Sequence, residues 1–332
     1  MDPRDFCTST RLLIVAGKGG VGKTTVTAAL SRMASRAGLD VLVVEVEGRS
    51  GLAGIFGRPG GLDYAEEVMV PAGRPAGAGA VRARTITPDD ALLEWLDEHG
   101  MRRISRRLLK TGTIDMVATA APGIKDILVL GKVKQLERAS ASGARRGIDL
   151  IIVDAPAAGH AVTFLQSAHG LLDAVRVGPI RTQAQDVSEM LTDPTRCQVM
   201  LVALPEETPV NELIETAYSL EDLVGIQLAP VVVNAVYPSL GGLDADPAEA
   251  AHAAGVNLAP GQVSALAQAA AFRRQRQELQ AAQTARLAEA LPLPQLRLPY
   301  LFTESVGPAE VEILAAALAS EVGKLPTPAT VR

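Results

Sequence analysis

The sequence predicts an α/β fold in which a doubly wound, mostly parallel sheet is flanked by helices. Two observations support it: short apolar runs alternate with helical patterns, and a glycine-rich loop directly follows the first run. The runs expected as strands are residues 12–16, 41–46, 150–153, 199–204 and 228–233. Right-handed crossovers bring the carboxyl ends of such strands to one edge of the sheet, where ligands bind.

The loop after the first run is a phosphate-binding motif. Residues 17–25 read GKGGVGKTT, which fits GxxxxGKT, and a helical pattern follows over residues 26–37. Backbone N–H groups of such a loop surround phosphate oxygens, while Lys23 can reach the terminal phosphates and the Thr24 hydroxyl can bind Mg²⁺. The positive N-terminus of the helix points at the same anion. The predicted nucleotide-binding residues of the loop are Gly17, Lys18, Gly19, Gly20, Val21, Gly22, Lys23, Thr24 and Thr25. The alternative, a glycine-rich turn without a ligand, fits the strand–loop–helix context less well.

Two carboxylates follow predicted strands. Asp154 ends an apolar run, so its carboxylate can hold a water on Mg²⁺ together with Thr24, whereas a helix cap is the structural alternative. Glu47 follows the second strand, where a carboxylate could orient an attacking water. Strand alternation puts Glu45 on the same face, so one of the two could instead pair with a cation; Glu47, nearer the strand end, is the candidate. His160 is expected to be structural or part of a switch.

Composition narrows the class of protein. The 332 residues are 48% hydrophobic and 21% charged, and the net charge of −5 does not indicate a basic nucleic-acid surface. Residues 1–10 lack the apolar core of a secretory signal, and no apolar run approaches the ~20 residues of a membrane span. We therefore expect a cytoplasmic protein, with peripheral attachment to the inner face of the membrane left open. Cys7 and Cys197 support neither a disulfide scaffold nor a zinc ribbon, and Cys197 is expected to be buried.

The chain is expected to form one domain over residues 1–332. The segments predicted within it are a strand at 81–87, helices at 88–98, 101–110 and 123–139 that make a helical insertion over 88–140, a helical excursion over 239–291 and a frayed tail over 324–332. The excursion contains a long helix over 263–291, on which Arg273, Arg274 and Arg276 are predicted to form a solvated face.

With these elements in place, the chain resembles the deviant-Walker P-loop NTPases, and within them the arsenite-pump and tail-anchored-protein-targeting ATPases, in a bacterial branch described as anion-transporting ATPases. The segments that support the resemblance are GKGGVGKTT at 17–25, APGI at 121–124, DAPAAGHAVTFL at 154–165, ALPEETPVNE at 203–212, VVVN at 231–234 and LPYLFTESVG at 298–307. The resemblance implies ATP and Mg²⁺ as cofactors. It also implies that Asn234 reads adenine and that the loop with Pro299, Tyr300 and Leu301 covers the base.

The resemblance gives Lys18 a separate role. In that family the extra lysine crosses a dimer interface to the partner's phosphates, a task comparable to that of an arginine finger. Lys18 and Lys23 would then be catalytic, together with Asp154 and Glu47. Since the chain has one phosphate loop, the composite site would need a homodimer or a heterodimer with a paralogous ATPase.

The chain also departs from the family pattern. The first switch normally reads DPAHNLSDAF, whereas residues 47–56 read EGRSGLAGIF, so Glu47 replaces the catalytic aspartate and hydrolysis could be slow. The arsenite-binding cysteines and the zinc CxxC are missing. Residues 177–193 are too short and polar for a large client groove.

The expected function is a Mg²⁺-dependent, ATP-hydrolysing dimeric switch that drives a membrane-linked process, such as anion export or membrane-protein handling. A membrane-protein partner or client is expected, and nucleic acid is not. One alternative is a poorly hydrolysing, nucleotide-binding regulatory subunit of a heterodimer, motivated by Glu47. Another is a chromosome-partition or division-site positioning ATPase; residues 310–324 lack the basic amphipathic face for membrane attachment, which argues against it.

Overall fold

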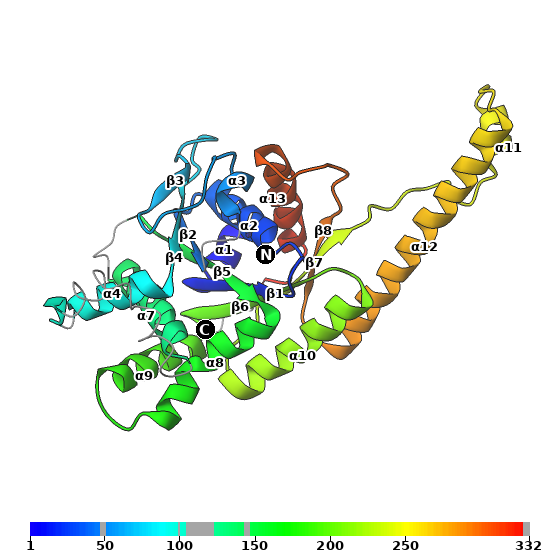
Figure 1. Cartoon of the computed structure of the whole chain (residues 1–332). Coiled ribbons are helices and arrows are strands. Elements are labelled where there is room, and N and C mark those ends of the chain that lie inside the picture. Colours follow the sequence, from blue (N-terminus) through cyan, green and yellow to red (C-terminus); the bar gives the residue numbers. More distant parts are fainter. Residues whose placement is uncertain (47–50, 99, 104–122, 143–146, 328–332) are drawn as a thin grey trace.

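The computed structural model describes residues 1–46, 51–98, 100–103, 123–142 and 147–327. An eight-stranded sheet has the order β3-β4-β2-β5-β1-β6-β7-β8, and its neighbouring strands are parallel except for β3 with β4. The strands are β1 (Leu12–Gly17), β2 (Val41–Val46), β3 (Glu67–Val70), β4 (Val81–Ile86), β5 (Leu150–Ala157), β6 (Cys197–Ala203), β7 (Val231–Val236) and β8 (Gln295–Pro299). The predicted doubly wound fold is confirmed (Figure 1).

Helices cover both faces of the sheet, which explains why β1 and β2 are fully buried and, apart from Glu45 of β2, apolar. The helices packed in the core on one face are α1 (Pro3–Cys7), α2 (Lys23–Arg36), α3 (Leu52–Ile55) and α13 (Pro308–Gly323). Those packed in the core on the other face are α4 (Pro88–Glu98), α7 (Ile124–Ala141), α8 (Ala158–Ala174), α9 (Pro179–Thr192) and α10 (Glu207–Val224). Both cysteines are buried, Cys7 at the end of α1 and Cys197 at the start of β6, as expected for Cys197.

Two strands were not predicted, and one was displaced. β3 is a four-residue antiparallel strand at one edge, and β8 is the strand at the other edge, where its side chains alternate between exposed and buried. Neither therefore has the continuous apolar run of a central parallel strand. The run at 228–233 becomes a strand only from Val231, because Pro230 has no N–H for a ladder and Leu228 makes only an isolated bridge to Val199.

The helical insertion is partly described. The helices predicted at 88–98 and 123–139 are confirmed as α4 and α7. Of the helix predicted at 101–110, only residues 101–103 are described, and Arg102 and Arg103 are helical. The extent of the insertion as a unit remains a prediction. Among the described residues, none of the helices has the length and apolar character needed to cross a membrane.

The most prominent feature outside the sheet is an arm formed by α11 (Pro247–Ala253) and α12 (Pro260–Ala290), which extends away from the body in Figure 1. The predicted long helix is confirmed, and at 31 residues α12 measures roughly 46 Å. The root of the arm is fixed by the buried Gln280, which accepts a hydrogen bond from the N–H of Tyr237 (2.8 Å) and donates one to the carbonyl of Ala235 (3.1 Å). The arm is therefore tied to the end of β7.

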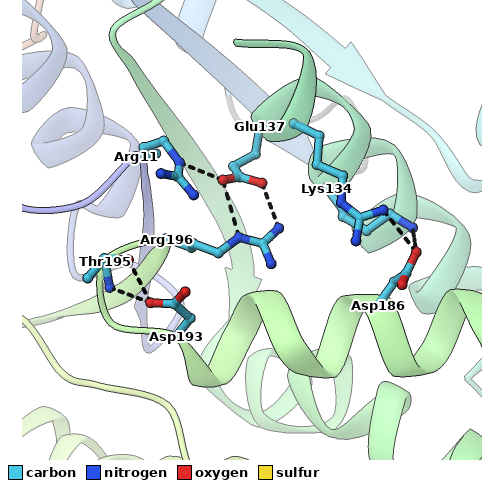
Figure 2. A network of polar contacts seen from close by, with 8 residues as sticks. Arg11, Lys134, Glu137, Asp186, Asp193, Thr195 and Arg196 are labelled. Atoms are coloured by element: carbon cyan, nitrogen blue, oxygen red, sulfur yellow. Dashed lines mark hydrogen bonds and ion pairs between the residues drawn. The ribbon is translucent and has the colours of Figure 1, made fainter. Parts of the chain in front are cut away.

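A buried carboxylate joins three elements at the edge of the sheet where β1 and β6 begin. Glu137 of α7 accepts hydrogen bonds from Arg11, just before β1, at 2.6 Å and from Arg196, just before β6, at 2.7 Å (Figure 2). Desolvation alone would raise the pKa of Glu137, but the bonds from Arg196 and Arg11 outweigh it and lower the pKa. This site thus lies at the edge opposite the phosphate loop and stabilises the sheet from that side.

Candidate functional site

The phosphate loop connects β1 to α2 through glycines that need a left-handed backbone. Gly20 has φ +86° and Gly22, the residue before α2, has φ +90°. Residues with a Cβ rarely adopt this conformation, so the motif's glycines explain why the chain can make the turn here. The helix predicted after the loop, over residues 26–37, is confirmed, and it begins three residues earlier, at Lys23. Its N-terminal N–H groups therefore face the space that the loop surrounds.

Asn234 of β7 touches the loop directly. Its side-chain Nδ2 donates a hydrogen bond to the carbonyl of Val21 at 2.9 Å. A Cβ added at Gly22 would lie 2.4 Å from that same Nδ2 atom. Gly22 is therefore required both for its backbone conformation and for the close approach of Asn234.

We expect Gly22→Ala to weaken ATP binding by about tenfold or more. The added methyl group would force a non-glycine residue into a left-handed conformation and displace Asn234, a combined cost of about 1–3 kcal/mol. Titration with a fluorescent ATP analogue measures the change. Gly170→Ala, at an exposed position in α8 with open space around its Cβ, is the control and should bind like the wild type. Equal affinities of the two variants would contradict the argument.

Lys23, Thr24 and Asp154 lie together beneath the loop. The Thr24 hydroxyl donates to Asp154 Oδ2 at 2.8 Å, and Asp154 is buried in β5, between β1 and β2. The Lys23 ammonium donates to the carbonyl of Lys18 at 3.2 Å. Burial lowers the pKa of Lys23, and the Asp154 carboxylate offsets part of that effect. The sequence predicted that these residues act together; in the structure Thr24 and Asp154 are in direct contact, and Lys23 lies near enough to Asp154 for the carboxylate to influence its pKa.

Lys18 extends from the same loop in another direction. Its ammonium pairs with the carboxylate of Glu212 on α10 at 2.5 Å, and the side chains are 37% and 38% exposed, respectively. The two lysines of the motif therefore have different surroundings. Sequence reasoning did not single out Glu212, although it lies in the quoted segment 203–212, since 194 positions separate it from Lys18.

The residues predicted around the base lie on, or directly after, the neighbouring strands β7 and β8. β7 contains Asn234, and β8 ends at Pro299, while the N–H of Tyr300 donates to the carbonyl of Val236 at 2.8 Å. Leu301 follows in the same loop and is partly buried. Ala235 has φ +57°, a conformation uncommon for alanine, and it turns the chain directly after Asn234.

An aromatic cluster beside this loop was missed by sequence reasoning. The ring centroids of Tyr237 and Tyr300, and those of Tyr300 and Phe302, are 4.9 Å apart. The Arg273 guanidinium lies 4.4 Å above the Tyr237 ring and donates to the carbonyl of Pro238 at 2.7 Å. Arg273 is partly buried against these rings, so the predicted solvated face is wrong for this residue. The sequence does contain a signal for this cluster: Tyr237 directly follows β7, and Tyr300 and Phe302 follow β8.

The other two arginines of that face are also paired. Arg276 contacts Glu206 at 2.9 Å and Arg274 contacts Asp244 at 2.8 Å.

His160 lies exposed in the first turn of α8, where a helix start was expected. Glu47 lies outside the described residues, so its prediction as the water-orienting carboxylate stands as made. Glu45 is buried in β2, in register with Asp154 on β5.

The donor set at the loop fits a hard divalent cation such as Mg²⁺. Thr24 and Asp154 offer oxygen atoms next to a loop shaped for phosphate. Within the described ranges, no group of three or more His, Cys, Asp or Glu residues could hold a metal. Mg²⁺ in nucleotide sites keeps several waters and takes one or two protein ligands together with phosphate oxygens, which is the number of protein ligands that Thr24 and Asp154 can supply.

Comparison with known proteins gives a family match over the first half of the chain. The sequence pattern described as "Anion-transporting ATPase" matches residues 10–176. "ATPase BagA" of Mycobacterium tuberculosis is 35% identical over 232 residues, which are 69% of this chain and 66% of that protein. A "Putative arsenical pump-driving ATPase" of Halobacterium salinarum is 26% identical over 69% of this chain and 36% of its own length. "ATPase get3" of Schizosaccharomyces japonicus is 27% identical over 48% of this chain and 44% of its own length. The match spans just under two thirds of the mycobacterial relative.

Proposed function

Because the chain belongs to the anion-transporting ATPase family, we propose that it is a Mg²⁺-dependent ATPase that works as a dimeric switch. The observation that supports this most directly is the joint position of Lys23, Thr24 and Asp154 under a glycine-rich loop at the start of α2. This arrangement combines phosphate binding, a cation site and a helix N-terminus at one sheet edge.

Each residue of the site has a definite task in this proposal. The backbone of residues 17–25 surrounds the phosphates, and Lys23 neutralises the terminal ones. Burial of Lys23 strengthens its attraction to phosphate, because less water screens the charge. Asn234 and the loop with Pro299, Tyr300 and Leu301 hold the base. Glu47 orients the water.

Thr24 and Asp154 would hold Mg²⁺ in this proposal. When bound, the ion supplies charge that stabilises the phosphates during transfer. The Thr24–Asp154 hydrogen bond keeps both oxygen donors in place beforehand. Lys18 acts in the site of a second chain, which makes hydrolysis depend on dimer formation.

Phosphate release from ATP by the purified chain tests the proposal. We expect Mg²⁺-dependent release that is lost on addition of EDTA, and Asp154→Asn should lower the turnover by about 100-fold because the neutral amide attracts the cation poorly. Asp222→Asn, an exposed residue at the end of α10, is the control. Release that is unaffected by EDTA, or ATP binding that is absent altogether, would contradict the proposal.

A second candidate function is favoured by Glu47 in place of an aspartate. In it, the chain binds nucleotide, hydrolyses it poorly and regulates a paralogous ATPase as a heterodimer. The extra methylene of Glu47 could misplace the water, and an error of about 1 Å can cost ~100-fold in rate. ATP binding with near-zero turnover, restored by a co-encoded paralogue, would support this candidate. Robust turnover of the isolated chain would contradict it.

The names of the relatives suggest what the switch drives. One is described as a putative arsenical pump-driving ATPase and another as an ATPase get3. We propose that this chain serves a membrane-linked process, either anion export or membrane-protein handling, as a cytoplasmic protein that attaches peripherally to the inner face of the membrane. Co-purification with membrane vesicles, in the presence and absence of ATP, tests this attachment.

A further inference from the structure

Lys18, the extra lysine of the phosphate loop, forms an ion pair with Glu212 of α10. Lys18 is attached to the loop through its backbone, because its carbonyl accepts a hydrogen bond from the Lys23 ammonium at 3.2 Å. Its side chain instead reaches α10 and contacts Glu212 at 2.5 Å. The side chains of the two lysines of one loop thus have different partners: Lys18 contacts the Glu212 carboxylate, and Lys23 contacts a backbone carbonyl.

Glu212 is well placed to hold that position. It lies in the second turn of α10, whose neighbouring residues Val210 and Leu213 are buried in the core. The Glu212 carbonyl also accepts a hydrogen bond from the Thr216 hydroxyl at 2.6 Å. The backbone beneath the carboxylate is therefore fixed, while the carboxylate itself remains more than a third exposed and open to exchange.

We propose that Glu212 is the positioning residue of Lys18. In the separate chain, Glu212 holds the lysine extended outside its own phosphate site. It releases the lysine when the phosphates of a second, ATP-bound copy of this chain approach. The inference rests on the proposed function, in which Lys18 acts across a dimer.

The exposure of the pair sets the size of the effect. A half-exposed ion pair is weak enough to break when a more highly charged anion competes for the ammonium group. The ion pair still lowers the fraction of chains in which Lys18 is available to a partner chain. The apparent affinity of one chain for another is reduced in proportion to that fraction. Together these give an effect on dimer formation of about 2–5-fold.

The test compares Glu212→Gln, which keeps the size of the side chain and removes its charge, with Glu215→Gln, an exposed glutamate on the same helix. Phosphate release per chain is measured over a range of chain concentrations. We expect the half-maximal concentration of Glu212→Gln to be about 2–5-fold lower than that of the wild type, with a similar rate at saturation. Glu215→Gln should match the wild type. Sedimentation with a non-hydrolysable ATP analogue should show the same shift.

A double-mutant cycle separates positioning from a general effect on folding. In a Lys18→Ala background, Glu212→Gln should cause no further shift of the dimer in sedimentation, because its target is gone. A persistent shift, or an unchanged or higher half-maximal concentration in Glu212→Gln alone, would overturn the inference while leaving a concentration-dependent ATPase intact. Turnover per chain that does not depend on concentration, with no dimer in sedimentation, would instead overturn the dimeric switch itself.

Discussion

Lys18→Ala and Lys23→Ala should each lower ATP turnover by about 1,000-fold, and an equimolar mixture of the two variants should recover about a quarter of the wild-type rate. Lys23 serves the phosphates of its own chain, whereas Lys18 is proposed to serve those of the partner. A mixed dimer then contains one complete site, formed by Lys23 of the Lys18→Ala chain and Lys18 of the Lys23→Ala chain. Half of the dimers are mixed, and each has one active site of two, which gives about a quarter.

Phosphate release before and after mixing measures this recovery. Lys324→Ala, which removes an exposed lysine at the end of α13, is the control for loss of a positive charge and should keep the wild-type rate. A mixture as inactive as its components, with dimers present, would show that Lys18 acts within its own chain. Unchanged turnover in Lys18→Ala would exclude any catalytic part for this lysine.

Glu137→Gln should lower the free energy of unfolding by about 3 kcal/mol. The substitution leaves Arg11 and Arg196 without their shared counter-charge at the edge where β1 and β6 begin. Loss of one partner of a buried ion pair costs about 3–5 kcal/mol. We expect the lower end of that range, because the Arg11 side chain is 42% exposed and can turn toward water. Urea unfolding followed by circular dichroism measures the difference.

The pH dependence of that difference checks its cause. Glu137 has a lowered pKa in the folded chain, so its contribution is complete above its ordinary pKa of 4.5 and is lost as the pH falls toward the lowered value. The gap between wild type and Glu137→Gln should therefore narrow in acid below about pH 4.5. Glu221→Gln, an exposed residue on α10, should change the stability by less than about 0.5 kcal/mol. A gap that stays constant from pH 7 to pH 3 would contradict the electrostatic explanation.

The sheet could be predicted to the extent that its strands are buried on both faces. β1, β2, β5 and β6 each contain a run of four or more consecutive apolar residues, and such runs are visible in a single sequence. β3 and β8 lie at the edges and mix polar with apolar residues. Their strand structure depends on a neighbouring strand rather than on their own pattern, so the sequence alone did not reveal them.

The same distinction holds for the site. The glycine pattern indicates the loop, because the backbone conformations of Gly20 and Gly22 depend on local chemistry. The partners of the loop come from distant parts of the chain: Glu212 reaches Lys18 across 194 positions and Asn234 reaches Val21 across 213. A single sequence does not indicate such pairings. Arg273, a charged residue on a long helix, was predicted to be solvated, but the fold places the rings of Tyr237 and Phe302 beside it.

Because Cys7 and Cys197 are both buried, a cysteine introduced on the arm can be labelled selectively with a dye. Burial, aided by the charge of Asp2, raises the pKa of Cys7 to about 12, and burial also raises the pKa of Cys197. Both thiols therefore stay protonated and shielded at neutral pH, and neither reacts readily with a maleimide dye. A cysteine introduced at the exposed Ala254, at the far end of the arm, would then accept the dye selectively. Fluorescence from that position would report whether the arm moves when nucleotide binds at the phosphate loop. Gln280, which ties the root of the arm to the end of β7, links the two regions.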